Sequence, residues 1–178
     1  MTMHNFALAD METEADPETE DQPPTVLTFS IGSQLFAVDV HCVREILDMT
    51  EIGALPNAPH DVLGMIDLRG QGIAIVDLAG KIGAHLQDPS AARIIVFEFS
   101  AHTGSEETTS LGIMADRVLR VQEIDAAQIE PVPDTMSGWN CDVAEGMLRS
   151  DEGIAMLLRI QDILAGSQPR GPFDFSDR

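Results

Sequence analysis

Aromatic residues are scarce in this chain. Of its 178 residues 4% are aromatic, with one Trp, seven Phe and no Tyr, although 44% are hydrophobic. The hydrophobic core therefore has to be built mainly from Val, Ile, Leu and Met. The length is sufficient for one substantial core, or for two small cores that share an interface.

Basic residues are also few. Ten Lys and Arg stand against 30 Asp and Glu, which gives a formal net charge of -20. A field of this sign repels phosphate backbones and anionic lipid surfaces, so we expect no nucleic acid partner. No uninterrupted apolar stretch approaches the about 20 residues of a membrane span, and no basic and then apolar leader opens the chain. The sequence predicts a cytoplasmic protein with no direct membrane insertion.

The sequence also lacks the motifs of a catalytic or cofactor site. Cys42 and Cys141 form no Cys-x-x-Cys pair, and the five His residues show no ligand spacing. There is no nucleotide-binding glycine motif and no Gly-x-Ser-x-Gly. Asp67, Asp77 and Asp116 each end a strand-like run, where an acidic residue is more often a turn or cap group than a catalyst. We expect no enzyme activity, no cofactor and no metal.

The N-terminal part of the chain changes character near residue 25. Residues 1–24 are acidic, contain three Pro and offer little apolar surface, which is typical of a disordered arm. Residues 26–40 alternate apolar and polar residues around Gly32-Ser33, which predicts a hairpin. Residues 41–47 space their apolar side chains three and four apart, which predicts a short helix.

The rest of the chain has mainly strand-like patterns. We expect strands at 62–70 and 72–78 around a turn that carries Arg69, at 92–99, at 110–124 with a bend at 116–117, and in a hairpin at 141–150 and 153–158. Short helices are expected at 78–86 and 157–166, an exposed loop at 101–110, a turn-rich connector at 128–140 and a loose tail at 166–178. About ten short strands with short helices are typical of an all-β protein of small barrels or sandwiches.

Several of these segments, taken in order, resemble the CheW-like family of chemotaxis coupling proteins. The most specific are FAVDV-x-x-VREI at 36–46, GMIDLRG-x-x-IAIVDL at 64–78 and LGIMADRV at 111–118, and the resemblance extends over 25–165. It implies two intertwined five-stranded β-barrels of the small Src-homology (SH3-like) type, with short helices and a C-terminal helix. We place the change of subdomain near 80–90.

The resemblance also implies a function in recognition. Members of the family have no catalytic activity and act as adaptors in chemotaxis signal transduction: they bind the regulatory domain of a CheA-type histidine kinase and the cytoplasmic tip of a methyl-accepting chemoreceptor. The chain is then expected at receptor arrays near the inner membrane. Two alternatives remain open. One is a regulator of pilus motility or another chemosensory pathway that binds a receptor without recruiting a kinase, and the other is a barrel that binds a small ligand between its two halves.

Five residues are candidates for partner contact. Arg69, Glu45 and Val43 match family positions linked to partner binding, and Val40 and Val38 lie just before them in the sequence. Arg69 is the first choice, because its planar guanidinium can bridge carboxylates or carbonyls of a partner. Arg69 could instead pair with an acidic residue of its own chain. The three valines could line a groove for an apolar helix face, or could simply be core residues.

Three glycines are expected to serve backbone geometry. Gly64 also matches a family position linked to binding, and Gly70 and Gly112 lie in the turn and strand motifs. Close approach of strands or a positive φ explains such glycines better than ligand contact.

Overall fold

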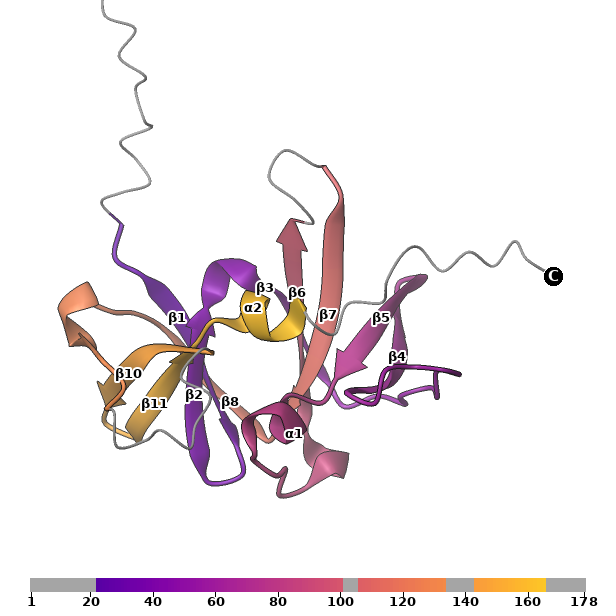
Figure 1. Ribbon diagram of the computed structural model, residues 1–178, viewed down its shortest axis with the longest axis horizontal. Coiled ribbons are helices and arrows are strands. Elements are labelled where there is room, and N and C mark those ends of the chain that lie inside the picture. Colours follow the sequence, from indigo (N-terminus) through magenta and orange to yellow (C-terminus); the bar gives the residue numbers. More distant parts are fainter. Residues whose placement is uncertain (1–21, 101–105, 134–142, 166–178) are drawn as a thin grey trace, which may run out of the picture.

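The computed structural model describes residues 22–100, 106–133 and 143–165, and these form two β-sheets with few helices (Figure 1). The six-stranded sheet has the order β8-β1-β2-β11-β10-β9 and consists of β1 (Thr25–Ile31), β2 (Gln34–Asp39), β8 (Arg117–Glu123), β9 (Ile129–Glu130), β10 (Ala144–Ser150) and β11 (Gly153–Leu158). The five-stranded sheet has the order β3-β6-β7-β5-β4 and consists of β3 (Val43–Asp48), β4 (Val62–Leu68), β5 (Gln71–Val76), β6 (Arg93–Ser100) and β7 (Thr108–Ala115). The expected all-β class is confirmed.

Short helices connect the strands. The two α-helices are α1 (Leu78–Ile82) and α2 (Ile160–Ala165), and the 3-10 helices are η1 (Val40–Cys42), η2 (Pro89–Ala91) and η3 (Ala126–Gln128). Asp77 caps α1 by accepting a hydrogen bond from the Gly80 N–H at 2.9 Å, and Gly83 ends it at φ +70°. The interpretation of Asp77 as a cap group is confirmed.

Three hydrophobic clusters show how the sheets pack. The largest joins the two sheets, because Phe29 and Phe36 come from the six-stranded sheet and Phe97 from the five-stranded one. A second cluster, around Ile73 and Ile94, lies within the five-stranded sheet. A third, with Val26, Ala37, Leu148 and Leu157, lies within the six-stranded sheet. Each sheet thus has a small core of its own, and the largest cluster holds the sheets together.

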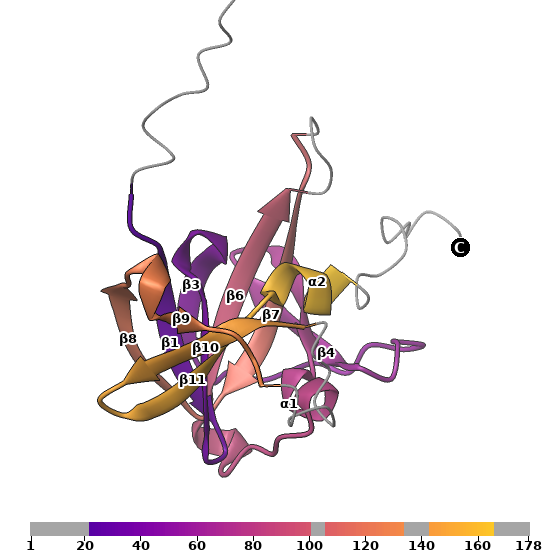
Figure 2. The same cartoon turned by 60° about the vertical axis from the view of Figure 1, so that its left-hand side comes forward.

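The chain changes from one sheet to the other at two places. It leaves the six-stranded sheet through η1, between β2 and β3, and returns to it at Asp116, between β7 and β8. In Figure 2, β8, β1, β10 and β11 of the six-stranded sheet lie toward the left of the view, and β6, β7 and β4 of the five-stranded sheet lie toward the right. Residues 80–90, where the sequence suggested a change of subdomain, lie between β5 and β6, which both belong to the five-stranded sheet.

The predicted helix at 41–47 is wrong. Its last five residues belong to β3, whose side chains alternate between partly buried and exposed, and which pairs antiparallel with β6. Val43 and Leu47 are four residues apart and lie on the same, partly buried face of the strand, whereas Ile46 lies on the exposed face, so the apolar spacing only imitated that of a helix. A segment this short does not form a helix without packing that favours it, and here pairing with β6 decides.

Other boundaries differ more modestly. The predicted loop at 101–110 is shorter at its end, since β7 already begins at Thr108, and its first five residues lie outside the described part of the chain. The expected arm up to residue 21, residues 134–142 of the connector and hairpin, and the tail at 166–178 also lie outside the described residues.

Candidate functional site

Arg69 occupies a tight turn in a strained backbone conformation. Leu68 pairs with Gln71, so Arg69 and Gly70 form a two-residue hairpin turn between β4 and β5, with φ values of +52° and +83°. Turns of this kind favour Asn-Gly, because positive φ is unfavourable for a residue with a long side chain. The side chain of Asp67 supports the turn by accepting a hydrogen bond from the Gly70 N–H at 2.8 Å. An Arg in this position points to a use for its side chain.

The structure brings Arg69 and Glu45 together. The Arg69 guanidinium donates through Nη2 to Glu45 Oε1, while 71% of the Arg69 side chain stays exposed. The second carboxylate oxygen of Glu45, Oε2, is buried and accepts no hydrogen bond from any described residue. The intramolecular pair considered from the sequence therefore exists, and it leaves most of the guanidinium at the surface.

Arg44 forms a second polar connection beside this pair. Its Nη1 donates to Gln71 Oε1 and to Ser110 Oγ, both at 3.0 Å, and lies 3.6 Å from a carboxylate oxygen of Glu98. We refer to Arg44, Glu45, Arg69, Gln71, Glu98 and Ser110 as the polar edge cluster. Sequence reasoning did not single out Arg44, although it lies in the VREI motif, because its partners Gln71 and Ser110 are distant in the sequence.

The polar edge cluster joins the two ends of the five-stranded sheet. Strands β3 and β4 are the outermost strands of this sheet, yet Glu45 on β3 contacts the turn that follows β4. Gly53, in the connector after β3, pairs with Met65 on β4 through backbone hydrogen bonds of 2.8 and 2.9 Å. The sheet is therefore so strongly curled that its two edges meet around a small core.

The three valine candidates differ in accessibility. Val38 is completely buried in the largest hydrophobic cluster, so it is a core residue and cannot contact a partner. Val43 is half-buried at the start of β3, two residues before Glu45, and Val40 is half-buried in η1. Val43, which also packs against the largest cluster, and Val40 therefore stay candidates for partner contact, and Val38 does not.

The three glycines meet different requirements. A Cβ on Gly64 would lie 2.3 Å from the Gly53 carbonyl oxygen, so the backbones approach too closely for any side chain. Gly70 has open space around it and is required only for its positive φ. A Cβ on Gly112 would lie 2.6 Å from Ile75 Cδ1, which is the end of a flexible side chain.

Several exposed apolar side chains were also missed. Ile46 on β3, Leu63 on β4, Val121 on β8 and Ile154 on β11 keep 38%, 45%, 54% and 47% of their surface exposed. Outward strand positions normally carry polar residues, so an apolar residue there was a signal available from the sequence. These exposed side chains provide apolar surface beside the charged residues of the same strands.

Cys42 is a partly buried free thiol at the end of η1. Burial, followed by the nearby Asp39 carboxylate, raises the pKa of its thiol. The thiolate is the reactive form, so iodoacetamide should modify Cys42 several-fold more slowly at pH 8 in the folded protein than in urea. The test uses a Cys141→Ser variant and mass spectrometry, and equal rates in both states would contradict the raised pKa.

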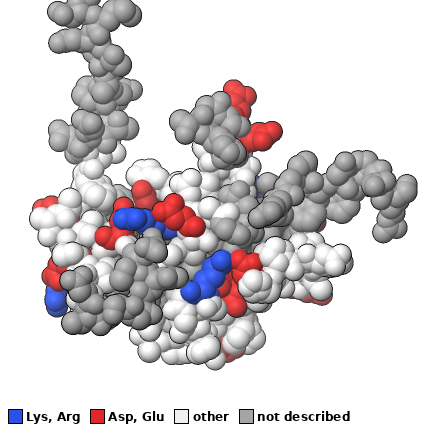
Figure 3. Space-filling view, viewed as in Figure 1, with Lys and Arg blue, Asp and Glu red and all other residues white. Residues whose placement is uncertain are grey.

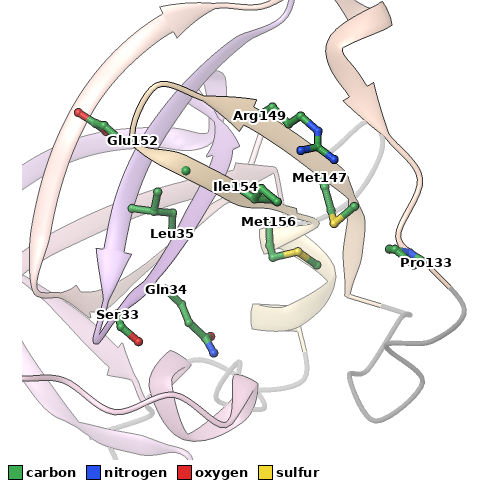
Figure 4. Close-up of a pocket in the computed structure, with 10 residues that line it drawn as sticks. Ser33, Gln34, Leu35, Pro133, Met147, Arg149, Glu152, Ile154 and Met156 are labelled. Carbon is green, nitrogen blue, oxygen red and sulfur yellow. The ribbon is translucent and has the colours of Figure 1, made fainter.

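A separate groove lies on the six-stranded sheet (Figure 4). It has a volume of about 630 Å³, and its lining includes Met147, Met156, Ile154, Arg149 and Glu152. Arg149 pairs with the neighbouring Glu130 at 2.8 Å, which raises the pKa of Arg149 and lowers that of Glu130. This surface ion pair accounts for the pKa shifts of both residues.

Charges on the described surface are mixed rather than separated. Figure 3 shows Lys and Arg side chains adjoining Asp and Glu on the face in view. Within residues 22–100, 106–133 and 143–165, no group of three or more His, Cys, Asp and Glu side chains could hold a metal ion. Among the same residues, neither α-helix is long and apolar enough to cross a bilayer.

Comparison with known proteins gives consistent matches. The model of the CheW-like domain family matches residues 25–168. A chemotaxis protein CheW of Thermotoga maritima is 30% identical over 154 residues, which cover 86% of this chain and 94% of that protein. A probable chemotaxis protein CheW of Rhizobium etli is 29% identical over 143 residues, which cover 80% of this chain and 88% of that protein.

A solved structure has the same fold. The scaffolding protein TtCheW of Thermoanaerobacter tengcongensis superposes with a TM-score of 0.68 at 24% identity, over 86% of this chain and 94% of that one.

Proposed function

The chain belongs to the CheW-like domain family, and we propose that it is a non-catalytic adaptor that couples a methyl-accepting chemoreceptor to a CheA-type histidine kinase in chemotaxis. It would act in the cytoplasm at receptor arrays. The family supports the general role of a scaffold in chemotaxis. The specific partners are our proposal, and the geometry of Arg69 is the observation that carries it.

The physical argument starts from the strain at Arg69. Holding a residue other than Gly at positive φ costs about 1 to 2 kcal/mol, and the ion pair with Glu45 returns only about 0 to 1 kcal/mol because most of the Arg69 side chain is in water. The stability of the fold alone therefore does not explain why an Arg stands at position 69. A guanidinium that is fixed at one end by Glu45 and still largely exposed is instead well suited to bridge a partner carboxylate or carbonyl.

The surroundings of Arg69 provide further contact groups. Val43 lies two residues before Glu45 on β3, is half-buried and also packs against the largest hydrophobic cluster, and half-buried Val40 lies in η1. Ile46 follows Glu45 and exposes apolar surface on the other face of the same strand. An apolar centre with one anchoring Arg and charged neighbours is the usual composition of a protein interface hot spot. We propose this surface for partner contact, with Gly64 and Gly70 holding the backbone that presents it.

A substitution of Arg69 should separate binding from folding. In Arg69→Asn the turn becomes the favoured Asn-Gly type, but the mostly buried Glu45 carboxylate loses this partner. The two effects oppose each other, so the free energy of unfolding should change by about 1 kcal/mol or less. Loss of the guanidinium should weaken partner binding about tenfold or more. Urea unfolding and titration of the protein into receptor-containing membranes with the kinase measure the two effects.

The matched control is Arg93→Gln. It removes another exposed ion pair of the same sheet, between Arg93 Nη1 and Asp48 Oδ1 at 2.5 Å, and should leave binding unchanged. Equal loss of binding in both variants would mean that overall charge, and not the Arg69 site, matters. Binding to receptor membranes without any recruitment of kinase would instead favour the regulator of another chemosensory pathway.

A further inference from the structure

Asp116 connects more backbone segments than any other residue that we describe at the boundary between the sheets. It lies between β7 and β8, where the chain passes from one sheet to the other. Its Oδ2 accepts a hydrogen bond from the Gly32 N–H at 2.6 Å, and its Oδ1 accepts from the N–H groups of Gln87 and Asp88 at 2.9 and 3.3 Å. Its own N–H donates to the Ser30 carbonyl at 2.9 Å.

The partners of this carboxylate belong to both halves of the molecule. Gly32 is in the β1–β2 turn of the six-stranded sheet, whereas Gln87 and Asp88 are in the connector that leads to β6 of the five-stranded sheet. The two segments also touch directly, because a Cβ on Gly32 would lie 2.7 Å from the His85 carbonyl oxygen. We call this contact of three segments the Asp116 junction. Figure 1 shows the β1–β2 turn beside the connector near α1, at the bottom of the view.

The Asp116 junction is remote from the polar edge cluster. Ser110 of that cluster is near the beginning of β7, and Asp116 directly follows its end, so about 20 Å of extended chain separates them. The other passage between the sheets, η1, adjoins β3 and therefore the cluster. The sheets are thus connected at two distant places, of which one carries the candidate partner surface and the other the Asp116 carboxylate.

The hydrogen bonds of the Asp116 junction depend on direction, whereas the apolar contacts of the core do not. The largest hydrophobic cluster holds the two sheets together, but apolar attraction has little directional preference. Hydrogen bonds to a carboxylate are stronger than neutral ones and depend on direction. Three N–H groups, one in the β1–β2 turn and two in the connector before β6, donate to this one carboxylate and so restrict how the two segments can lie relative to each other.

We propose that Asp116 is the positioning residue of the adaptor: its carboxylate fixes the orientation of the two sheets, so that the surfaces that they offer to partners are held in one relative geometry. This inference rests on the proposed adaptor function, because it concerns how two binding events are connected and not how either partner is bound. Asp116 itself contacts neither partner. Its loss should leave each separate binding affinity within about threefold and remove the transmission between partners.

The geometric part can be tested without any partner. Two spin labels are attached at exposed strand positions, Leu63→Cys on β4 and Glu145→Cys on β10, in a chain with Cys42→Ser and Cys141→Ser, and their distance distribution is measured by double electron–electron resonance. Asp116→Asn keeps the shape but has one acceptor oxygen, so N–H groups on one side of the junction lose their partner. We expect one narrow distribution for the unsubstituted junction and a broader or shifted one for Asp116→Asn.

Asp88→Asn is the matched control. It makes the same change of charge in the same region, but the Asp88 carboxylate accepts only local hydrogen bonds, from the N–H and the hydroxyl of Ser90. Its distance distribution should equal that of the parent. If Asp116→Asn does not fold, Asp116→Glu serves the same test, because it keeps the charge and displaces the carboxylate. An unchanged distribution in a folded Asp116 variant overturns the proposal.

The functional part uses the full receptor, kinase and adaptor assembly. In Asp116→Asn the change of kinase activity caused by receptor ligand should fall about tenfold, with both separate affinities preserved, whereas Asp88→Asn should behave as the parent. Equal transmission in Asp116→Asn and the parent overturns the positioning role. If the parent protein itself binds no kinase or receptor, the proposed function fails, and the spin-label distances still decide whether Asp116 orients the sheets.

Discussion

Gly64→Ala is expected to destabilise the fold by about 3 kcal/mol. The added Cβ would lie 2.3 Å from the Gly53 carbonyl oxygen and 2.6 Å from Ile52 Cγ2. One of these contacts is with backbone, so relief requires the Gly53 segment to move away and break its 2.8 and 2.9 Å hydrogen bonds to Met65. These bonds link the connector after β3 to β4, so the curled edge of the five-stranded sheet should open. Urea unfolding measures the loss.

Gly112→Ala is the matched control for this substitution. Its Cβ would lie 2.6 Å from Ile75 Cδ1 and 3.4 Å from Ile94 Cγ2, both side-chain atoms. Rotation of Ile75 can relieve the overlap, so the expected loss is about 1 kcal/mol. A larger loss for Gly112→Ala than for Gly64→Ala would contradict the assignment of Gly64 to close backbone approach.

Phe36→Ala is expected to cost about 3 to 5 kcal/mol. Phe36 is completely buried in the cluster that joins the sheets, and its ring centroid lies 5.8 Å from that of Phe29. Because this cluster includes side chains from both sheets, the loss should lower the protection of amides in both sheets together. Hydrogen exchange and urea unfolding provide the two readouts.

The control for Phe36→Ala is Val40→Ala, four residues further along the chain. Val40 lies half-buried in η1 and belongs to none of the three clusters, so about 1 kcal/mol or less is expected. Loss of protection confined to the six-stranded sheet in Phe36→Ala would show that the two sheets unfold separately, contrary to a shared core.

Periodicity was sufficient to predict most strands. The hairpins around Gly32, Gly70 and Gly153 follow from alternating apolar residues on both sides of a turn. The short segment after residue 40 was predicted wrongly, because the apolar Ile46 on the exposed face of β3 gave the sequence a helix-like spacing. Pairing with β6 decides the outcome there, and a partner strand 50 residues away has no local signal.

The candidate site was only partly predictable for a related reason. Motif resemblance singled out Glu45 and Arg69, and the structure joins them in one ion pair. It could not show that Val38 points into the core, since both faces of β2 carry apolar residues. The role of Asp116 at the sheet boundary was also hidden, because its hydrogen-bond partners at Gly32 and Gln87 are distant in sequence. Contacts of this kind depend on how the sheets are packed.

The most direct test of the proposed adaptor function is calorimetric titration of the purified protein with the regulatory domain of its CheA-type kinase. We expect saturable one-to-one binding that persists when residues 1–24 are deleted. The Arg69→Asn variant should be titrated in parallel, once urea unfolding has shown that its free energy of unfolding is close to that of the parent. It should bind about tenfold more weakly if this partner uses the Arg69 surface. Absence of binding to any kinase regulatory domain from the same cell would contradict the account.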